Sequence, residues 1–235
     1  MPRKPRLSVA GVCEHVIQRG NNRQVIFATE EDMKAYLTWL KEYSNRFQVS
    51  IHVWVLMTNH VHLLCTPSSP ESISKMMQSL GRMYVMYFNR TYQRTGTLWE
   101  GRYRSCLVES DTYLFELYRY IEMNPVRANM VTYPDDYNWS SHQCNAYGEG
   151  STLVTPHQRY LELGRTLEER QSNYRALFKA QVAPKVVLGI VEATNKGVAL
   201  GSDKFIDEIE ALTGVRAESK KRGRKLGWKK KITED

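Results

Sequence analysis

Apolar residues alternate with polar ones over some stretches of the chain and recur every three or four residues over others. Alternation is typical of a half-buried strand, because successive side chains of a strand point to opposite faces, whereas the longer period marks one face of a helix. In chain order the pattern predicts a strand over 11–19, a helix over 29–47, strands over 49–57 and 60–66, a helix from 71 to about 92, a strand near 103–108 and a helix over 111–124.

The order of these elements predicts an α+β fold. A turn at Thr58 and Asn59 joins the strands on either side of it into a β-hairpin. Strands that alternate with helices in this order form a small antiparallel sheet, so we expect a ferredoxin-like sheet with helices packed on one face.

Further helical stretches follow in the last third of the chain, within 156–180, 184–195 and 203–213. They read as a small helical appendage that precedes a basic tail. The chain is therefore expected to divide into a domain over 1–145, a helical region over 146–215 and a tail over 216–235.

The net charge of +8 lies mostly in the tail. Residues 216–231 hold nine Lys and Arg side chains against one acid, Glu218, whereas residues 1–215 carry only +2. Such a tail usually adds salt-sensitive affinity for nucleic-acid phosphates, although it can also be a merely solvated end. Arg222 and Arg224 flank a glycine in a short, common pattern like a minor-groove hook, which makes them candidate DNA contacts.

The remaining composition indicates an ordinary globular protein of a reducing compartment. We expect no membrane span, because no run of about eighteen apolar residues occurs, and no secretory signal, because no apolar region follows the basic N-terminus. The four cysteines (Cys13, Cys65, Cys106 and Cys144) are widely spaced and are interpreted as buried thiols, not as a disulfide framework or a zinc site. A cytoplasmic location follows from these features.

Two histidines stand two positions apart in the predicted strand over 60–66. His60, His62 and Leu64 point to one face of that strand and Val61 and Leu63 to the other. Two imidazoles on one face can hold a divalent metal between them. The alternative is a pair of histidines on the exposed face of a half-buried strand.

The helix over 111–124 carries tyrosines and an asparagine on one face. Tyr113, Tyr120 and Asn124 share this face, so a phenol and a carboxamide one turn apart are available beside the histidines. Pro125 ends or kinks the helix at Asn124, which can instead cap a second turn. Spacing alone does not choose Tyr120 over Tyr113 or Tyr118.

Hydrogen-bonding groups gather at two further places. Near the end of the first strand they suit phosphates or base edges, although a plain polar hairpin explains them as well. In the loop after residue 93, Trp99 suits base stacking or packing in the core, and two arginines suit phosphates. The polar candidates at these places are Arg19, Asn21, Asn22, Arg23, Arg102 and Arg104.

Four stretches together resemble the single-tyrosine HUH (IS200-like) transposases, and in particular their REP-associated tyrosine transposase branch. These stretches are Gln18–Arg23, Val55–Leu64, Trp99–Tyr103 and Tyr118–Ala128. They occur in the order that the family has, and the resemblance covers about residues 8–145.

The resemblance implies a role for individual residues. His60 and His62 match the metal ligands of the family, and Tyr120 matches its catalytic tyrosine. Asn124 matches the polar residue that completes the metal site, a position where other members have Gln. Tyr113 and Tyr118 remain competing nucleophiles.

The resemblance also implies an activity. It is metal-dependent cleavage and rejoining of single-stranded DNA at hairpins, through a 5′-phosphotyrosine intermediate, during DNA transposition. Mg²⁺ or Mn²⁺ is the expected cofactor, and a monomer or homodimer associated with the nucleoid is expected. One rival is a non-catalytic hairpin-binding descendant of a transposase. Another is a His-x-His metal hydrolase, but the remaining histidines (His15, His52, His142 and His157) show no spacing that supplies its third ligand.

Overall fold

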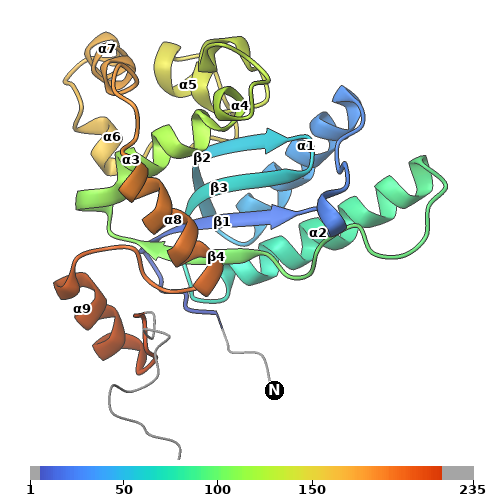
Figure 1. The fold of residues 1–235 in the computed structure, drawn as a ribbon, viewed down its shortest axis with the longest axis horizontal. Helices are drawn as coiled ribbons and strands as arrows, with labels where there is room; N and C mark the ends of the chain where they lie inside the picture. The colour runs from blue at the N-terminus through green and yellow to red at the C-terminus, as the bar shows by residue number, and fades with distance from the viewer. Residues whose placement is uncertain (1–5, 219–235) are drawn as a thin grey trace, which may run out of the picture.

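Four strands form one antiparallel sheet at the centre of the computed structural model, which describes residues 6–218 (Figure 1). The strand order is β2-β3-β1-β4, the order of a ferredoxin-like sheet, which confirms the predicted fold class. The strands are β1 (Cys13–Arg19), β2 (Val49–Met57), β3 (His60–Pro67) and β4 (Arg104–Val108).

The sheet register places the predicted histidine pair next to the end of β1. Within the antiparallel pair of β1 and β3, Arg19 lies opposite His60 and Ile17 lies opposite His62. Side chains of directly opposed residues lie on the same face of a sheet. The histidines and Arg19 therefore share one face.

Helices α1 (Glu30–Arg46) and α2 (Ser72–Thr91) cover the opposite face of the sheet. A capping box between Thr29 and Asp32 fixes the start of α1. Leu63 of β3 packs in the core between this face and the two helices.

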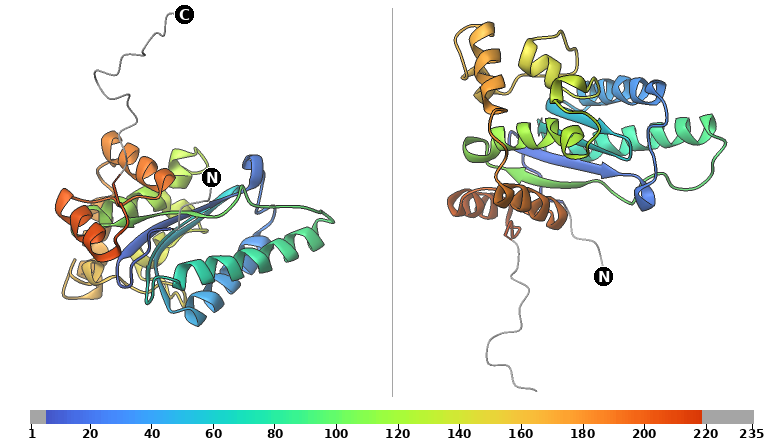
Figure 2. Two further views of the ribbon diagram at one scale, coloured as in Figure 1. Left: turned by 90° about the horizontal axis from the view of Figure 1, so that it is seen from below. Right: turned by 45° about the horizontal axis from the view of Figure 1, so that its top comes forward.

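The face that carries the histidines is covered as well, by α3 (Ser110–Glu122) and α8 (Pro184–Lys196) (Figures 1 and 2). Leu64 of β3 and Cys106 of β4 pack in this second core. The expectation of helices on one face only was therefore too narrow. The strands are buried on both faces, which weakens the polar–apolar alternation that would have marked an exposed side.

Helix α3 ends close to the position that Pro125 predicts. It stops at Glu122, and a short helix α4 (Asn124–Arg127) begins directly after Met123. Pro125 stands in the first turn of α4, where its missing N–H breaks no helical hydrogen bond. Tyr120 and Asn124 therefore lie on either side of a helix boundary.

The C-terminal helices extend the core around the histidine face. Leu200 donates its backbone N–H to Leu107 at 2.8 Å, and Val154 forms a β-bridge with Ile51. Whether residues 146–215 would fold as a unit of their own stays a prediction. The remaining short elements are η1 (Asn21–Arg23), η2 (Pro134–Asp136), α5 (His142–Tyr147), α6 (Gln158–Leu161), α7 (Leu167–Leu177) and α9 (Asp203–Thr213).

Within residues 6–218, none of the helices combines the length and the apolar character that crossing a bilayer requires.

Candidate active site

His60 and His62 lie beneath α3, with their ring centroids 5.0 Å apart. His62 is 2% exposed and His60 is half-buried, so the pair runs from the core towards solvent. The structure thus brings the two imidazoles together on one face, as the spacing of the histidines predicts.

Tyr120 is the tyrosine that α3 places against this pair. Its ring centroid lies 5.7 Å from that of His62, edge to face. Tyr118 packs away from the pair, fully buried against Tyr174, and Tyr113 is half-buried at the start of the helix. Among the three tyrosines, Tyr120 has the geometry that a nucleophile beside the histidines requires.

Asn124 turns its amide nitrogen back towards α3. Its Nδ2 donates to the carbonyl of Tyr120 at 2.9 Å and to that of Ile121 at 3.2 Å. Both carbonyls belong to the last turn of α3, where backbone acceptors lack helical partners. Since the nitrogen is held in this way, the Oδ1 oxygen is the atom that Asn124 can offer to a cation.

Arg127 lies within the family-like stretch Tyr118–Ala128, but the sequence had predicted no role for it. Its guanidinium carbon lies 4.0 Å from the centre of the Tyr120 ring, and its Nη2 donates to the Tyr120 carbonyl at 3.0 Å. A guanidinium over an aromatic face is attracted to the ring. Arg127 is exposed, so it also brings a positive charge to the surface beside Tyr120.

The environment keeps both histidines neutral. Burial lowers the pKa of His60 to about 4, and the positive charges of Arg19 and Arg127 act in the same direction. Burial, followed by the neighbouring His15 and His60, lowers the pKa of His62 well below its ordinary value. A neutral imidazole carries the lone pair that binds a metal.

Hydrogen bonds define which nitrogen of His60 carries the proton. The side chain of Asn59 donates its Nδ2 to the carbonyl of Arg23 at 3.2 Å, so its Oδ1 is the acceptor. His60 Nδ1 lies 2.6 Å from that oxygen and must donate to it. The Nε2 lone pair of His60 is therefore available.

His15 and Thr194 support His62 in a comparable way. His15 Nε2 lies 2.8 Å from His62 Nδ1, and His15 Nδ1 lies 2.9 Å from the Thr194 hydroxyl. The spacing of His15 along the chain matches no ligand pattern. In the fold it contacts a predicted ligand instead.

The free donor atoms of His60, His62 and Asn124 fit a divalent metal by chemical type. His60 offers Nε2, Asn124 offers Oδ1, and the Nδ1 of His62 is occupied by His15, which leaves Nε2 of that ring as its ligand atom. Two imidazoles and one amide oxygen form a mixed donor set that suits Mn²⁺ and accommodates Mg²⁺.

A polar pocket lies beside β1 and β4, next to Arg19. Three of the predicted DNA contacts line it: Arg19, Arg102 and Arg104. The other lining residues are Ile17, Glu100, Gly101 and Asn195. Arg102 and Arg104 are exposed, and Arg104 donates to the side chain of Asn195 on α8. The structure thus gathers three predicted cations in one pocket, and Arg19 among them lies opposite His60 in the sheet.

The polar turn after β1 begins two residues beyond Arg19. Asn21, Asn22 and Arg23 follow β1 directly, and Asn22 and Arg23 adopt positive φ angles of 50° and 58°. Trp99 is only 8% exposed and donates to the carbonyl of Gly81 at 3.3 Å, so it packs in the core instead of offering a stacking surface. Arg222 and Arg224 lie outside the described residues.

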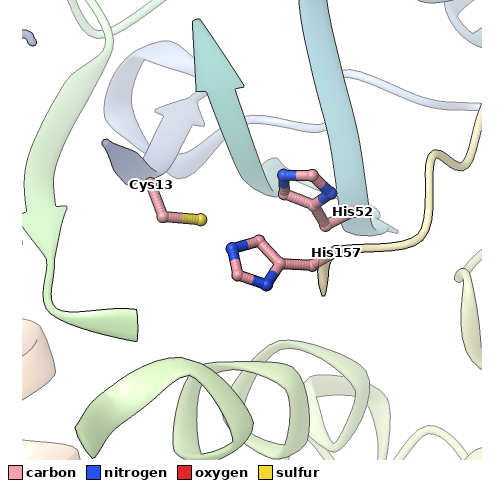
Figure 3. Close-up of side chains that lie close together, drawn as sticks. All are labelled: Cys13, His52 and His157. Atoms are coloured by element: carbon pink, nitrogen blue, oxygen red, sulfur yellow. The ribbon is translucent and has the colours of Figure 1, made fainter. Parts of the chain in front are cut away.

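A second group of possible metal ligands lies elsewhere on the same side of the sheet. Figure 3 shows Cys13, His52 and His157 close together, and one ligand atom of each lies within 4.8 Å of the others. His52 already donates from Nδ1 to the Thr155 carbonyl at 2.7 Å and accepts at Nε2 from the Thr66 hydroxyl at 2.9 Å. Burial raises the pKa of the Cys13 thiol to about 12.

This grouping could not be found from sequence spacing, because its members come from β1, β2 and the segment before α6. A soft metal would have to displace the Thr66 hydroxyl from His52 and deprotonate Cys13. Without a metal, the hydrogen bonds account for the arrangement of His52.

A buried polar network around Glu122 holds the C-terminal end of α3 in place. Glu122, which is 0% exposed, accepts hydrogen bonds from Ser141 at 2.6 Å, His142 Nδ1 at 2.7 Å and Tyr174 at 2.6 Å. His142 Nε2 lies 2.8 Å from Asp135. Burial alone would lower the pKa of His142. The hydrogen bonds to Glu122 and Asp135 and the charges of these two carboxylates outweigh burial and raise the pKa. His142 thus has a carboxylate at each ring nitrogen, which favours its charged form and ties α5 to α3.

Comparison with known sequences places this fold in a family of DNA transposases. Residues 8–124 match the family described as IS200-like transposases, which includes β1 to β4 and the whole of α3. The chain belongs to this family.

The solved structures that are similar to the chain include two transposases. A REP-associated tyrosine transposase bound to a REP hairpin is 18% identical, with a TM-score of 0.51 over 67% of this chain and 93% of that one. A candidate transposase from Deinococcus radiodurans R1 is 21% identical, with a TM-score of 0.37 over 52% of this chain and 96% of that one. The first shares the fold. No curated protein sequence matches the chain.

Proposed function

We propose that the protein cleaves and rejoins single-stranded DNA at hairpin sequences through a covalent bond to Tyr120, as a transposase of the REP-associated branch. One observation carries this proposal: the ring of Tyr120 lies 5.7 Å from that of His62, next to His60, in a member of the IS200-like family. A tyrosine that stands beside two neutral imidazoles combines a nucleophile with a metal-binding pair.

His60, His62 and Asn124 are the residues that would hold a divalent metal, through their free Nε2 and Oδ1 atoms. Such a cation would supply polarisation of the scissile phosphate and neutralise charge that builds up on its oxygens. The three residues come from β3 and from the start of α4, so the helix boundary at Met123 sets the position of the third ligand relative to the first two.

Tyr120 performs the chemistry. Its phenol loses a proton and the oxygen attacks the phosphorus; the bond to the 3′ oxygen breaks, and that oxygen takes up a proton to leave as a 3′-hydroxyl. A 3′-hydroxyl then attacks the phosphotyrosine, which restores a phosphodiester and releases Tyr120. The covalent intermediate conserves the bond energy, so no nucleotide cofactor is required.

The DNA lies along the cationic pocket. Arg19, Arg102 and Arg104 line this pocket, Arg19 lies opposite His60, and Asn21 and Arg23 follow shortly after Arg19 in the chain. Arginines at this spacing neutralise phosphates of a single strand and orient it towards Tyr120. The similar REP-associated transposase was solved with a REP hairpin, which supports a hairpin as the substrate.

The decisive experiment is covalent trapping. We expect labelled single-stranded hairpins, incubated with Mn²⁺ or Mg²⁺, to give a protein–DNA adduct that survives denaturation. The adduct should disappear with Tyr120→Phe and with EDTA, and should persist with Tyr113→Phe, a matched change on the same helix. An adduct that survives in Tyr120→Phe would transfer the role to another tyrosine. Hairpin binding without any adduct would favour the non-catalytic hairpin-binding protein.

A further inference from the structure

A line of hydrogen bonds runs from α8 to the buried metal-ligand candidate His62. The Thr194 hydroxyl lies 2.7 Å from the Ile190 carbonyl one turn earlier in α8, and 2.9 Å from His15 Nδ1. His15 Nε2 in turn lies 2.8 Å from His62 Nδ1, and the planes of the two rings are parallel within 3°. Thr194, His15 and His62 are all at most 4% exposed, so no solvent replaces these partners.

Each bond in this line fixes the direction of the next. A carbonyl only accepts, so the Thr194 hydroxyl donates its single proton to Ile190 and must accept from His15. His15 then carries its proton on Nδ1, and its unprotonated Nε2 accepts from His62 Nδ1. His62 is left with a lone pair on Nε2, the ring nitrogen farther from the backbone.

Cys106 adds to the same pattern. Its thiol lies 3.3 Å from the Thr194 hydroxyl, and burial raises the pKa of this thiol to about 12, so it keeps a proton that it can donate. A hydroxyl has two acceptor positions and one proton. His15 and Cys106 fill both acceptor positions of Thr194, and Ile190 takes the proton.

The opposite direction places a proton on the metal-binding nitrogen. It requires the Thr194 hydroxyl to turn from the Ile190 carbonyl and donate to His15 Nδ1. His15 then carries its proton on Nε2 and donates to His62 Nδ1, so the His62 proton also stands on Nε2. His62 cannot ligate a metal from a protonated nitrogen. The contact between Thr194 and Ile190 favours the productive direction.

We propose that His15 is a positioning residue that Thr194 of α8 orients, and that together they hold His62 in the tautomer that leaves Nε2 free for a metal. The importance of this tautomer rests on the proposed function, but the tautomer itself does not. Thr194 lies beyond residues 8–124, the part that matches the family. The C-terminal region therefore has a specific role, because it orients a residue that contacts a ligand.

The tautomers can be observed directly in the metal-free protein. Long-range ¹H–¹⁵N correlation spectra of protein labelled at histidine distinguish protonated from unprotonated ring nitrogens. We expect both His15 and His62 to carry the proton on Nδ1. A proton on Nε2 of His62 in the wild type would overturn the proposal.

Thr194→Val removes the hydroxyl and keeps the shape of the side chain. We expect the His15 and His62 signals to move towards a mixture of tautomers, and the affinity for Mn²⁺ alone to fall by about tenfold or more, the usual effect of losing an outer partner of a ligating histidine. Thr213→Val is the matched control, because the Thr213 hydroxyl makes the same contact to the Ile209 carbonyl at 2.7 Å in α9. Unchanged tautomers and Mn²⁺ affinity in Thr194→Val would refute the inference.

His15→Phe provides a second variant should Thr194→Val fold poorly. It keeps a ring between α8 and β3 and removes the acceptor for His62 Nδ1, so Mn²⁺ affinity should fall while the fold, measured by backbone amide spectra, is retained. Retained Mn²⁺ affinity in this variant would contradict the proposal. The expected tautomers without any DNA adduct would refute the proposed function and leave the positioning role standing.

Discussion

The guanidinium of Arg127 lies 4.0 Å above the ring of Tyr120 and donates to the backbone carbonyl of the same residue at 3.0 Å. The first contact places a positive charge on one face of the proposed nucleophile, and the second ties that charge to the last turn of α3. Tyr120 thus has a cation over one face of its ring and an edge-to-face contact with the neutral imidazole of His62. These contacts give Tyr120 a defined orientation.

Arg127→Ala should therefore slow adduct formation. We expect a loss of about tenfold to a hundredfold in the single-turnover rate, because the variant loses both a contact that orients the ring and a charge beside the phosphate. Arg175→Ala is the matched control: Arg175 stacks on Tyr147 at 5.2 Å and bonds the neighbouring Ala146 carbonyl, away from the histidines. Equal rates for wild type and Arg127→Ala would remove Arg127 from the site.

The two histidine clusters should differ in their metals. We expect His60→Gln to abolish Mn²⁺ binding measured by calorimetry, because the variant removes a ligand. Cys13→Ser should leave Mn²⁺ binding unchanged, since its thiol belongs to the other cluster. A Co²⁺ titration separates the two clusters, because only the cluster with Cys13 can give a thiolate charge-transfer band. The opposite pattern would place the functional metal at Cys13, His52 and His157.

Removing a cation from the pocket should weaken DNA binding in a salt-dependent way. For Arg102→Ala we expect weaker hairpin binding and a salt slope that is shallower by about 0.7, the value for one phosphate contact on a single strand. Arg82→Ala, an exposed change on α2 across the sheet, should alter neither quantity. An unchanged slope in Arg102→Ala would show that the strand follows another path.

His142 gives the folded protein a defined dependence on pH. Glu122 and Asp135 raise its pKa above the ordinary value of about 6.5. Its charged form is therefore bound more tightly when folded, so its contribution to the free energy of unfolding is complete below about pH 6.5 and disappears as pH rises through the folded pKa. His142→Gln should cost about 3 kcal/mol at about pH 5.5, and less at about pH 9.

Urea unfolding at both pH values measures this difference. Glu122→Gln is an informative companion, because it keeps an oxygen for Ser141 and removes the charge that raises the pKa of His142. It should shift the pH dependence to lower pH. A cost of His142→Gln that is the same at both pH values would mean that His142 is neutral in the folded protein.

Much of the fold was accessible from local patterns. Alternation located the hairpin around Thr58 and Asn59, and the helical period located α1, α2 and α3, because these signals depend only on neighbouring residues. The second helical layer was not foreseen. A strand that is buried on both faces is apolar on both, so its sequence does not show which helices cover which face. The pattern in β2 and β3 therefore could not reveal that α8 packs on the sheet.

The candidate site divides in the same way. Short motifs contain His60, His62, Tyr120 and Asn124, so these four residues could be predicted from the sequence. His15 and Thr194 are 179 residues apart and meet only because α8 crosses β1 and β4. No local spacing encodes that meeting, and the same holds for Cys13, His52 and His157.

The crossing of α8 has a consequence for work with shortened chains. A fragment that ends after α5 would retain the histidine pair, the tyrosine and the asparagine, and by inspection of its sequence it would look intact. It would lack α8, and with it Thr194, which contacts both Cys106 and His15. Water would then reach His15 and the Nδ1 side of His62. Such a fragment would possess every signature residue of a transposase and still be an unreliable guide to what the whole chain does with a metal.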